Sequence, residues 1–413
     1  MIAPANGDVA CDHYHRYAED VALMREIGLK AYRFSFSWPR IFPEGTGKPN
    51  ARGVKFYHRL IDALLKAGVT PWATLFHWDF PLALYHRGGW LNRDSADWFG
   101  DYADFMAREF GDKIRHWITL NEPQCFVGLG HGEGCLAPGL VLPREDVLRV
   151  AHHAMMAHGA AVRALRSRLG RKAQIGYAPV GVVKEPLSES PADIAAARKH
   201  MFAVGEHFNW TNAWYGDPVV LGRYPEDGLK HHEALLPKGW EKDVKSICEP
   251  LDFYGANIYN SEKIRAGKNG RPEIMEYHSG SPLTAFKWVI SPSCLRWGPR
   301  FLHERYKLPI VITENGVSGA DWPQADGSVP DPMRVEFLRQ YIRELARGMS
   351  EGADVQGYFH WSLLDNFEWA QGYKERFGLV YVDFATGKRT PKASAAFFRD
   401  LIRSNREPTR KKS

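Results

Sequence analysis

The sequence predicts an α/β protein that folds as one (β/α)8 barrel of the TIM type, and three observations indicate this. Short apolar runs rich in β-branched and aromatic residues alternate along the chain with amphipathic helical patterns. The runs are apolar on both faces, which is typical of strands in a parallel sheet covered by helices. No Pro/Ser-rich linker or break in composition divides the 413 residues, so residues 1–413 are expected to form a single domain.

Seven strands are predicted, in chain order. They are 31–38, 70–78, 113–122, 173–179, 252–259, 308–315 and 355–363. Amphipathic stretches between them predict helices, with the clearest patterns at 15–29, 56–68, 95–111 and 334–352. Gly28, Gly68 and Gly111 lie at the ends of three of these stretches, and glycine is the expected stop signal of a helix.

The first strand of the barrel is the one that the sequence does not contain. A closed barrel of this type has eight strands, whereas residues 1–30 predict a loop and a helix only. We therefore expect an open seam between strands 31–38 and 355–363, with unpaired backbone groups along it. A start codon assigned too far downstream, a shortened sequence or a true variant would each give this pattern. Residues 1–12 or a second chain, as in an oligomer, could cover the seam.

Composition narrows the class of protein. A formal net charge of +6, with 25% charged and 44% hydrophobic residues, is ordinary for a globular protein. The basic residues form no stripe, which argues against nucleic acid as a partner. No apolar run approaches the ~18 residues that span a bilayer, and the N-terminus lacks a signal-peptide pattern. A cytoplasmic location without a membrane partner is therefore expected. Five cysteines at unrelated spacings predict neither a disulfide framework nor a metal site.

Polar and aromatic residues gather at the predicted carboxyl ends of the strands, where catalytic groups lie in such barrels. These residues are Arg33, His77, Trp78, Asn121, Glu122, Asn257, Tyr259, Glu314, Trp361, Glu368 and Trp369. Two carboxyl groups are the machinery of glycosidic bond cleavage, one as proton donor and the other as nucleophile or base. Aromatic faces, from 14 Trp, suit stacking on a pyranose ring. The sequence thus points to sugar chemistry, without metal or cofactor. Cys125, three residues past Glu122, is expected to pack near this rim.

At these positions the chain resembles glycoside hydrolase family 1, the β-glucosidase family. TLNEP (119–123) and ITENG (312–316) are similar to the acid/base and nucleophile signatures of that family. Further matching segments occur in family order over essentially the whole chain. They are 12–24, 31–43, 76–81, 87–94, 257–259 and 361–383.

The resemblance implies a retaining β-glycosidase that acts on a small β-glycoside or oligosaccharide. Glu314 would be the nucleophile and Glu122 the acid and then the base, with their carboxyls about 5–5.5 Å apart. Arg33 and Tyr259 would keep Glu314 ionised. The remaining expectations concern substrate binding: Asn121 at the 2-hydroxyl, His77 at the 3-hydroxyl, Trp361 as platform, Glu368 and Trp369 at the 4- and 6-hydroxyls, Trp288 as aglycone wall, and Trp78, Asn257 and Phe377 beside them.

Glu368 and Trp369 also bear on specificity. Family members that act on 6-phosphorylated sugars carry Ser and a nearby Lys–Tyr here, whereas a carboxylate would repel a phosphate. The resemblance therefore implies unphosphorylated β-glucosides as substrates, with β-galactosides or β-fucosides as side substrates.

Two departures from the family pattern leave alternatives open. The family's upstream strand carries a sugar-binding Gln in an A-x-Q-x-E-G-type segment, which this sequence does not contain. A catalytically weakened sugar-binding barrel therefore stays open, and so does a transglycosylase, which shares the covalent intermediate. Strand 173–179 ends in Ala178-Pro179, where many relatives have an Asn, so the aglycone preference is left open.

Overall fold

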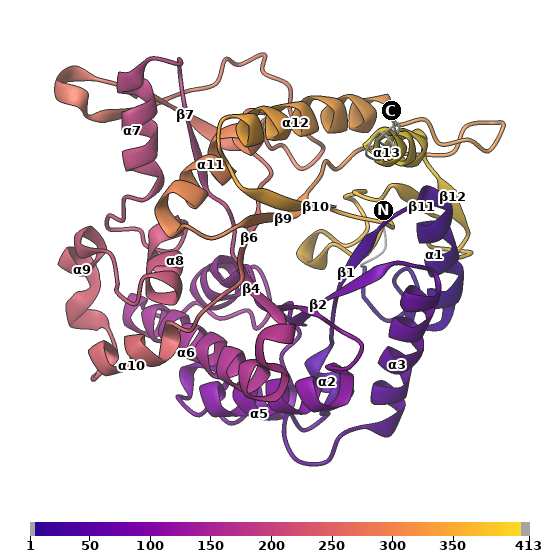
Figure 1. Ribbon diagram of the computed structural model, residues 1–413, viewed down its shortest axis with the longest axis horizontal. Helices are drawn as coiled ribbons and strands as arrows, with labels where there is room; N and C mark the ends of the chain where they lie inside the picture. Colours follow the sequence, from indigo (N-terminus) through magenta and orange to yellow (C-terminus); the bar gives the residue numbers. More distant parts are fainter. Residues whose placement is uncertain (1–4, 406–413) are drawn as a thin grey trace, which may run out of the picture.

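A computed structural model describes residues 5–405, and its centre is a seven-stranded, all-parallel sheet curled into a barrel (Figure 1). The strand order is β1-β2-β3-β4-β6-β9-β10. These strands are β1 (Ala31–Ser35), β2 (Thr70–Phe76), β3 (His116–Asn121), β4 (Gln174–Ala178), β6 (Phe253–Asn257), β9 (Ile310–Asn315) and β10 (Val355–His360). All seven predicted strands are therefore confirmed, although most end two or three residues before the predicted point.

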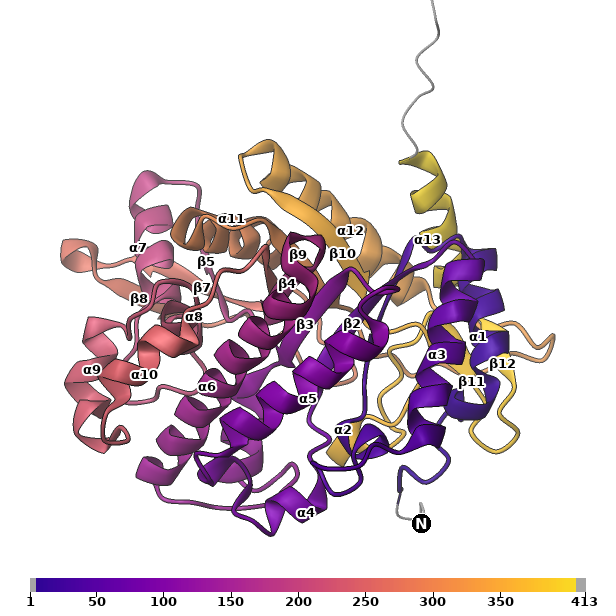
Figure 2. The same ribbon diagram turned by 60° about the horizontal axis from the view of Figure 1, so that its bottom comes forward.

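Helices form an outer layer around this sheet, and Figure 2 shows α3 and α5 along its outside. The longer ones are α1 (His13–Ile27), α3 (Ala51–Lys66), α5 (Ser95–Phe110), α6 (Arg144–Leu169), α7 (Pro191–Met201), α11 (Cys294–Tyr306), α12 (Pro332–Ser350) and α13 (Ala393–Ser404). Shorter ones are α2 (Trp38–Ile41), α4 (Leu82–Tyr85), α8 (Asn212–Val220), α9 (Glu226–His232) and α10 (Trp240–Ile247). The four predicted helices are confirmed as α1, α3, α5 and α12.

Glycine ends the helices in two different ways. Gly28 has φ +82°, and its N–H closes α1 by donating to the carbonyls of Met24 and Arg25; a side chain would be strained in this left-handed conformation. Gly111 ends α5 in ordinary right-handed geometry. A Cβ there would lie 2.3 Å from Leu169, so close packing against α6 explains this glycine.

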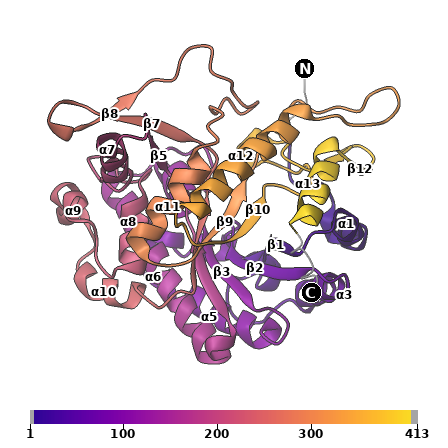
Figure 3. The same cartoon turned by 45° about the horizontal axis from the view of Figure 1, so that its top comes forward.

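Two small sheets lie outside the barrel and were absent from the sequence prediction. One joins β5 (Val183–Pro186), β7 (Ser261–Ala266) and β8 (Pro272–Met275), which Figure 3 shows projecting beside α7. The other is the antiparallel pair β11 (Val380–Val382) and β12 (Arg389–Pro391). Their strands of three to six residues are too short to give a clear periodicity.

The apolar core has two parts. The larger part lies between the sheet and the helices. The smaller part is a layer to which six of the seven strands contribute one side chain each, as in the packed interior of a barrel. Its members are Trp72, Ile118, Ala178, Phe253, Val311 and Phe359. β1 contributes none of them.

The expected seam is present between β1 and β10. Within residues 5–405, β1 pairs only with β2 and β10 only with β9. Residues 5–12 form no strand; Ala5 lies beside Gly372, and the Tyr373 hydroxyl donates to the Asn6 carbonyl. Within residues 5–405, no helix combines the length and the apolar character needed to cross a membrane.

Candidate active site

The predicted site residues come together around one cavity of about 530 Å³ at the carboxyl ends of the strands. Most of them line it: His77, Trp78, Glu122, Asn257, Tyr259, Trp288, Glu314, Trp361, Glu368, Trp369 and Phe377. Arg33 and Asn121 do not line it but lie behind the two glutamates, within hydrogen-bonding distance of the groups that do. The side chain of Asn121 is fully buried in a polar network, and its contact with the substrate stays a prediction.

Glu314, near the end of β9, is held as a carboxylate acceptor on both oxygens. Arg33 Nη1 donates to Oε1 at 2.6 Å, and the Tyr259 hydroxyl donates to Oε2 at 2.8 Å. Arg33 and Glu314 are 6% and 5% exposed at their side chains, so this ion pair is screened little by water. A cation and a hydroxyl donor both favour the charged form of a carboxyl. Burial, followed by the charge on Glu314, keeps the pKa of Tyr259 well above its usual value.

Glu122 directly follows β3 and has the opposite environment. Its φ of +45° turns the chain out of the strand, and its N–H donates to the Ala178 carbonyl. Asn257 Nδ2 donates to Oε1 at 2.9 Å, and the Cys125 thiol donates to Oε2 at 3.4 Å. Among residues 5–405, no Lys, Arg or His side chain forms an ion pair with Glu122. Burial, followed by the nearby charge of Glu314, raises the pKa of Glu122 to about 8. The two carboxyls therefore have opposite surroundings, with a cation and a hydroxyl beside Glu314 and an amide and a thiol beside Glu122.

The amide network behind the glutamates fixes their positions. Asn257 Nδ2 also donates to Asn121 Oδ1 at 3.0 Å, and Thr313 Oγ1 donates to Asn257 Oδ1 at 2.6 Å. Arg33 Nη2 donates to the same Asn121 oxygen, so one guanidinium joins β1, β3 and β9. Thr313 was missed because a threonine inside an apolar strand looks like an ordinary β-former. Only the packing of neighbouring strands shows that its hydroxyl is used.

Aromatic rings line the rest of the cavity. The rings of His77 and Trp361 stack with centroids 5.7 Å apart, and Trp78 and Trp369 lie 5.2 Å apart. Tyr259 and Trp288 are 5.1 Å apart on the other side. Burial, and then the positive charge of Arg33, lower the pKa of His77 well below its usual value. The imidazole is therefore neutral, and one of its ring nitrogens can donate to a hydroxyl.

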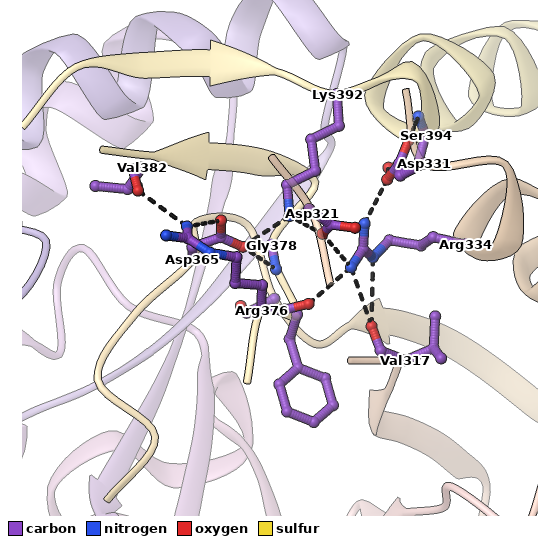
Figure 4. A network of polar contacts seen from close by, with 12 residues as sticks. Val317, Asp321, Asp331, Arg334, Asp365, Arg376, Gly378, Val382, Lys392 and Ser394 are labelled. Atoms are coloured by element: carbon purple, nitrogen blue, oxygen red, sulfur yellow. Dashed lines mark hydrogen bonds and ion pairs between the residues drawn. The ribbon is translucent and has the colours of Figure 1, made fainter. Parts of the chain in front are cut away.

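The segment 361–379 carries four of the predicted site residues and is anchored from behind by a buried ionic network (Figure 4). Asp365 accepts from Arg376 Nη1 and from Lys392 Nζ, each at 2.7 Å, and from the N–H of Gly378 at 3.0 Å. The network continues from Lys392 through Asp321 to Arg334. It fixes the segment at residues on both sides of Glu368.

Glu368 itself faces the cavity with a perturbed carboxyl. Burial, followed by the charge of Glu314, raises the pKa of Glu368 to about 7. Glu122, Glu314 and Glu368 thus bring three carboxyls to the cavity, beside the more exposed Glu262, and near neutral pH only part of their possible negative charge is present. Among residues 5–405, no group of three or more His, Cys, Asp or Glu side chains has the geometry of a metal site.

Comparison with known proteins agrees with this geometry. The family model described as glycosyl hydrolase family 1 matches residues 1–407. β-Glucosidase A of Acetivibrio thermocellus is 42% identical over 97% of this chain and 88% of its own length. β-Glucosidase A of Thermotoga maritima is 40% identical with the same coverage. The structure of the T. maritima β-glucosidase with glucoimidazole superposes with a TM-score of 0.88, covering 97% of this chain and 89% of that one. The chain therefore belongs to glycosyl hydrolase family 1 and is a glycoside hydrolase.

Proposed function

We propose that this enzyme is a retaining β-glucosidase that hydrolyses unphosphorylated β-glucosides through a covalent glycosyl-enzyme. The observation that carries the proposal is the contrast between the two buried glutamates. Glu314 is held by a guanidinium and a hydroxyl, whereas the pKa of Glu122 is raised to about 8. The relatives named above are β-glucosidases, and the T. maritima enzyme has been solved with glucoimidazole and with deoxynojirimycin.

In the first step, Glu314 attacks the anomeric carbon while Glu122 gives its proton to the glycosidic oxygen. The bond from Glu314 to carbon forms as the bond to the aglycone breaks, and the aglycone leaves as an alcohol. Once Glu314 is an ester, its charge no longer adds to the effect of burial on Glu122, so the pKa of Glu122 falls and its carboxylate can act as a base. In the second step Glu122 takes a proton from water, whose oxygen attacks the anomeric carbon and restores Glu314.

The other residues bind and orient the sugar in this proposal. His77 and Glu368 take hydroxyls, Trp361 and Trp369 give the ring platform, and Trp288 lines the aglycone side. Trp78 and Phe377 complete the aromatic wall. Asn121 accepts a hydrogen bond from Arg33, and Asn257 donates one to Glu122. The predicted contact of Asn121 with the 2-hydroxyl requires the substrate to reach its amide. A cytoplasmic location remains part of the proposal, and all five cysteines are unpaired.

The experiment is hydrolysis of 4-nitrophenyl β-glucoside with the product followed by proton NMR. We expect turnover with β-glucose as the first-formed anomer, because two inversions give retention. α-Glucose as the first product would contradict the mechanism. Binding of the glucoside without turnover would instead indicate a weakened sugar-binding barrel. A product dominated by disaccharide at low acceptor concentration would indicate a transglycosylase.

Specificity is tested with the 6-phosphate of the same substrate. Near pH 8 the Glu368 carboxyl, with a pKa of about 7, is mostly ionised and repels a dianionic phosphate. We expect kcat/KM for the unphosphorylated substrate to be higher, and the ratio to grow as pH rises through 7. The control is Glu368→Ser, which should reduce the ratio. Preferential cleavage of the phosphate by the unmodified enzyme would refute this specificity.

A further inference from the structure

Thr313 lies at a shift in register between β9 and β6, which are neighbours in the barrel (Figure 1). Ala256 of β6 pairs with Ile312 of β9. The next residue of β6, Asn257, pairs with Glu314, so β9 has one extra residue at this point, which is Thr313. Such irregularities are common beside active sites, where they change the direction of a side chain. This one brings the Thr313 hydroxyl to Asn257, and it donates to Asn257 Oδ1 at 2.6 Å.

The contact between Thr313 and Asn257 is closed off from water. Their side chains belong to residues that are 1% and 0% exposed. Gly255 leaves room for the threonine, since a Cβ at Gly255 would lie 2.9 Å from Thr313 Cγ2. A buried polar atom without a partner costs free energy, so the amide oxygen of Asn257 depends on the hydroxyl that Thr313 provides.

The orientation of the Asn257 amide is fixed from both of its ends. Arg33 can only donate, and its Nη2 donates to Asn121 Oδ1, so that oxygen is an acceptor. The atom of Asn257 that lies 3.0 Å from the same oxygen must then be the amide nitrogen. The amide oxygen of Asn257 consequently points toward β9, where Thr313 is the donor that it requires.

This fixed amide determines which oxygen of Glu122 can carry a proton. Asn257 Nδ2 donates to Oε1 at 2.9 Å, and a proton on Oε1 would oppose that N–H. Oε2 instead lies 3.4 Å from the Cys125 thiol, which can donate to a carboxylate or turn its hydrogen away and accept from a carboxylic acid. The proton of neutral Glu122 therefore belongs on Oε2.

We propose that Thr313 is a positioning residue, which acts through Asn257 to hold an amide donor on Oε1 of Glu122 and so leaves Oε2 to carry the proton that the aglycone receives. The inference rests on the proposed role of Glu122 as the acid. Thr313 does not line the active-site cavity, so it acts through the amide. In the first step the proton on Oε2 passes to the glycosidic oxygen, whose bond to the anomeric carbon breaks as Glu314 attacks. In the second step Oε2 takes a proton from the attacking water.

The test is the dependence of kcat/KM on the leaving group. 2,4-Dinitrophenyl β-glucoside releases a stable anion without help from an acid, whereas phenyl β-glucoside needs the proton. Thr313→Ala removes the hydroxyl, and Thr313→Val removes it while keeping the volume of the side chain. We expect kcat/KM for the phenyl glucoside to fall about tenfold in both variants, as the loss of one supporting hydrogen bond implies. For the dinitrophenyl glucoside we expect a change of less than about twofold.

Two further substitutions are matched controls. Thr313→Ser keeps the hydroxyl and should restore kcat/KM for the phenyl glucoside, so the difference between the Ser and Ala variants isolates the donor. Thr74 of β2 is fully buried, and its hydroxyl has no hydrogen-bond partner within residues 5–405. Thr74→Ala and Thr74→Ser should therefore both leave the ratio of the two kcat/KM values unchanged.

The pH profile gives a second readout that a purely structural role would not change. The amide of Asn257 favours the charged form of Glu122 and opposes the effect of burial on its pKa. Thr313→Ala weakens this contact, so the fall of kcat/KM should move to higher pH. The other titratable or charged groups near Glu122 stay in place in this variant. They are Arg33, Cys125, Tyr259 and Glu314.

Each alternative predicts a different result. Equal losses for the two glucosides in Thr313→Ala and Thr313→Val would show that Thr313 supports only the fold. No loss for either glucoside would show that Arg33 and Asn121 hold the amide alone, and a loss in Thr313→Ser as large as in Thr313→Ala would show that the hydroxyl is not the group that matters. Neutron diffraction at a pH below the Glu122 pKa of about 8 should find deuterium on Oε2, and deuterium on Oε1 would overturn the assignment.

Glu122→Gln, measured with the same two glucosides, separates this proposal from the proposed function. A selective loss for the phenyl glucoside in Glu122→Gln, with none in the Thr313 variants, would reject the positioning role and leave Glu122 as the acid. Equal losses for both glucosides in Glu122→Gln would reject the acid role itself and the positioning role with it.

Discussion

At the scale of single residues, two glutamates of the same chemistry are made different by what touches them. Glu314 accepts from a guanidinium and a phenol hydroxyl. Glu122 accepts from an amide and a thiol, and its raised pKa follows from burial and from the charge of Glu314. The neutral form of Glu122 can then donate a proton near neutral pH, where an ordinary glutamate would already be ionised.

The pH dependence of catalysis follows from this difference. Glu122 must be protonated to act as the acid, so kcat/KM for 4-nitrophenyl β-glucoside should fall as pH rises through about 8. Glu122→Gln should lower the rate by about 10²- to 10⁴-fold for leaving groups that need a proton. It should also remove this basic limb of the profile. If kcat/KM of Glu122→Gln still falls as pH rises through about 8, another group must be responsible for the fall. Glu368→Gln is the matched control, and its kcat/KM should still fall in this pH range.

Cys125 offers a second residue-scale test. Its thiol donates to Glu122 Oε2 at 3.4 Å, and a donor favours the charged carboxylate. Removing it in Cys125→Ala should therefore raise the pKa of Glu122 and move the basic limb to higher pH. Cys125→Ser keeps a donor and should leave the limb closer to its original place. If the pH profiles of the unmodified enzyme and of both variants are the same, the thiol does not affect Glu122. Cys125 then has only the packing role that the sequence suggested.

The sequence predicted the membership of this cluster and the support of Glu314 by Arg33 and Tyr259, but not its other contacts. Both glutamates, Arg33 and Tyr259 follow from strand ends and from the family resemblance. The thiol contact of Cys125 and the hydroxyl of Thr313 do not, because they depend on sub-ångström placement of neighbouring strands. The burial of Asn121 behind the cavity wall is likewise a property of packing, which no local pattern records.

At the scale of elements, the segment 361–379 depends on charges that lie far from it in sequence. Lys392 is fully buried between Asp365 and Asp321, at 2.7 and 2.6 Å (Figure 4). Burial lowers the pKa of Lys392, while the two carboxylates oppose this effect. Removing one member of such a network leaves the others as uncompensated buried charges.

Lys392→Met should accordingly lower the free energy of unfolding by about 3–5 kcal/mol. It should also raise KM, because Glu368 and Trp369 lie on the anchored segment. Lys388→Met, at an exposed position nearby, is the matched control and should change stability by less than about 0.5 kcal/mol. Denaturant unfolding of both variants checks the prediction. Similar small effects for the two would show that the network does not stabilise the fold.

The barrel strands and main helices were predictable because their periodicity is long and their faces are consistently apolar. The sheet β5-β7-β8 and the pair β11-β12 were not, since strands of three to six residues give no clear pattern. Part of this pairing joins distant segments: β5 and β7 are neighbours in the sheet, although residues 187–260 separate them in the chain.

At the scale of the whole molecule, α1 packs against α13 and closes the outer helical layer, whereas the sheet within residues 5–405 has free edges at β1 and β10. The pair of Asp20 and Arg389, 369 residues apart in sequence, joins α1 to β12 at 2.8 Å. Both side chains are buried, at 0% and 1% exposure. His13 also contacts Asp20, at 2.8 Å. This cluster holds the first helix against the last part of the chain.

Acid should weaken this closure. Burial alone would raise the pKa of Asp20, but the contacts with His13 and Arg389 outweigh it and lower the pKa below its usual value. The stability that this lowered pKa contributes is therefore fully present above about pH 3.9, the unfolded value, and is lost as pH falls through the lower folded value.

Asp20→Asn should cost about 3–5 kcal/mol at neutral pH, because it leaves Arg389 buried without its counter-charge. The loss of stability below about pH 4 should be less steep in this variant. Asp62→Asn, which removes an exposed partner of Lys113, is the control and should cost about 0–1 kcal/mol. Chemical denaturation at several pH values measures both. Parallel pH curves for Asp20→Asn and the unmodified protein would contradict the account.

We propose that Glu314 forms a covalent bond to the sugar during turnover, and trapping that bond is the sharpest experiment on this enzyme. A 2-deoxy-2-fluoro-β-glucoside with an activated leaving group slows both steps, and the slow second step lets the glycosyl-enzyme accumulate. Mass spectrometry of the inactivated protein should show one 2-fluoroglucosyl group per chain, located by peptide mapping on Glu314. A label on any other residue, or hydrolysis of β-glucosides with inversion and no label, would contradict the account.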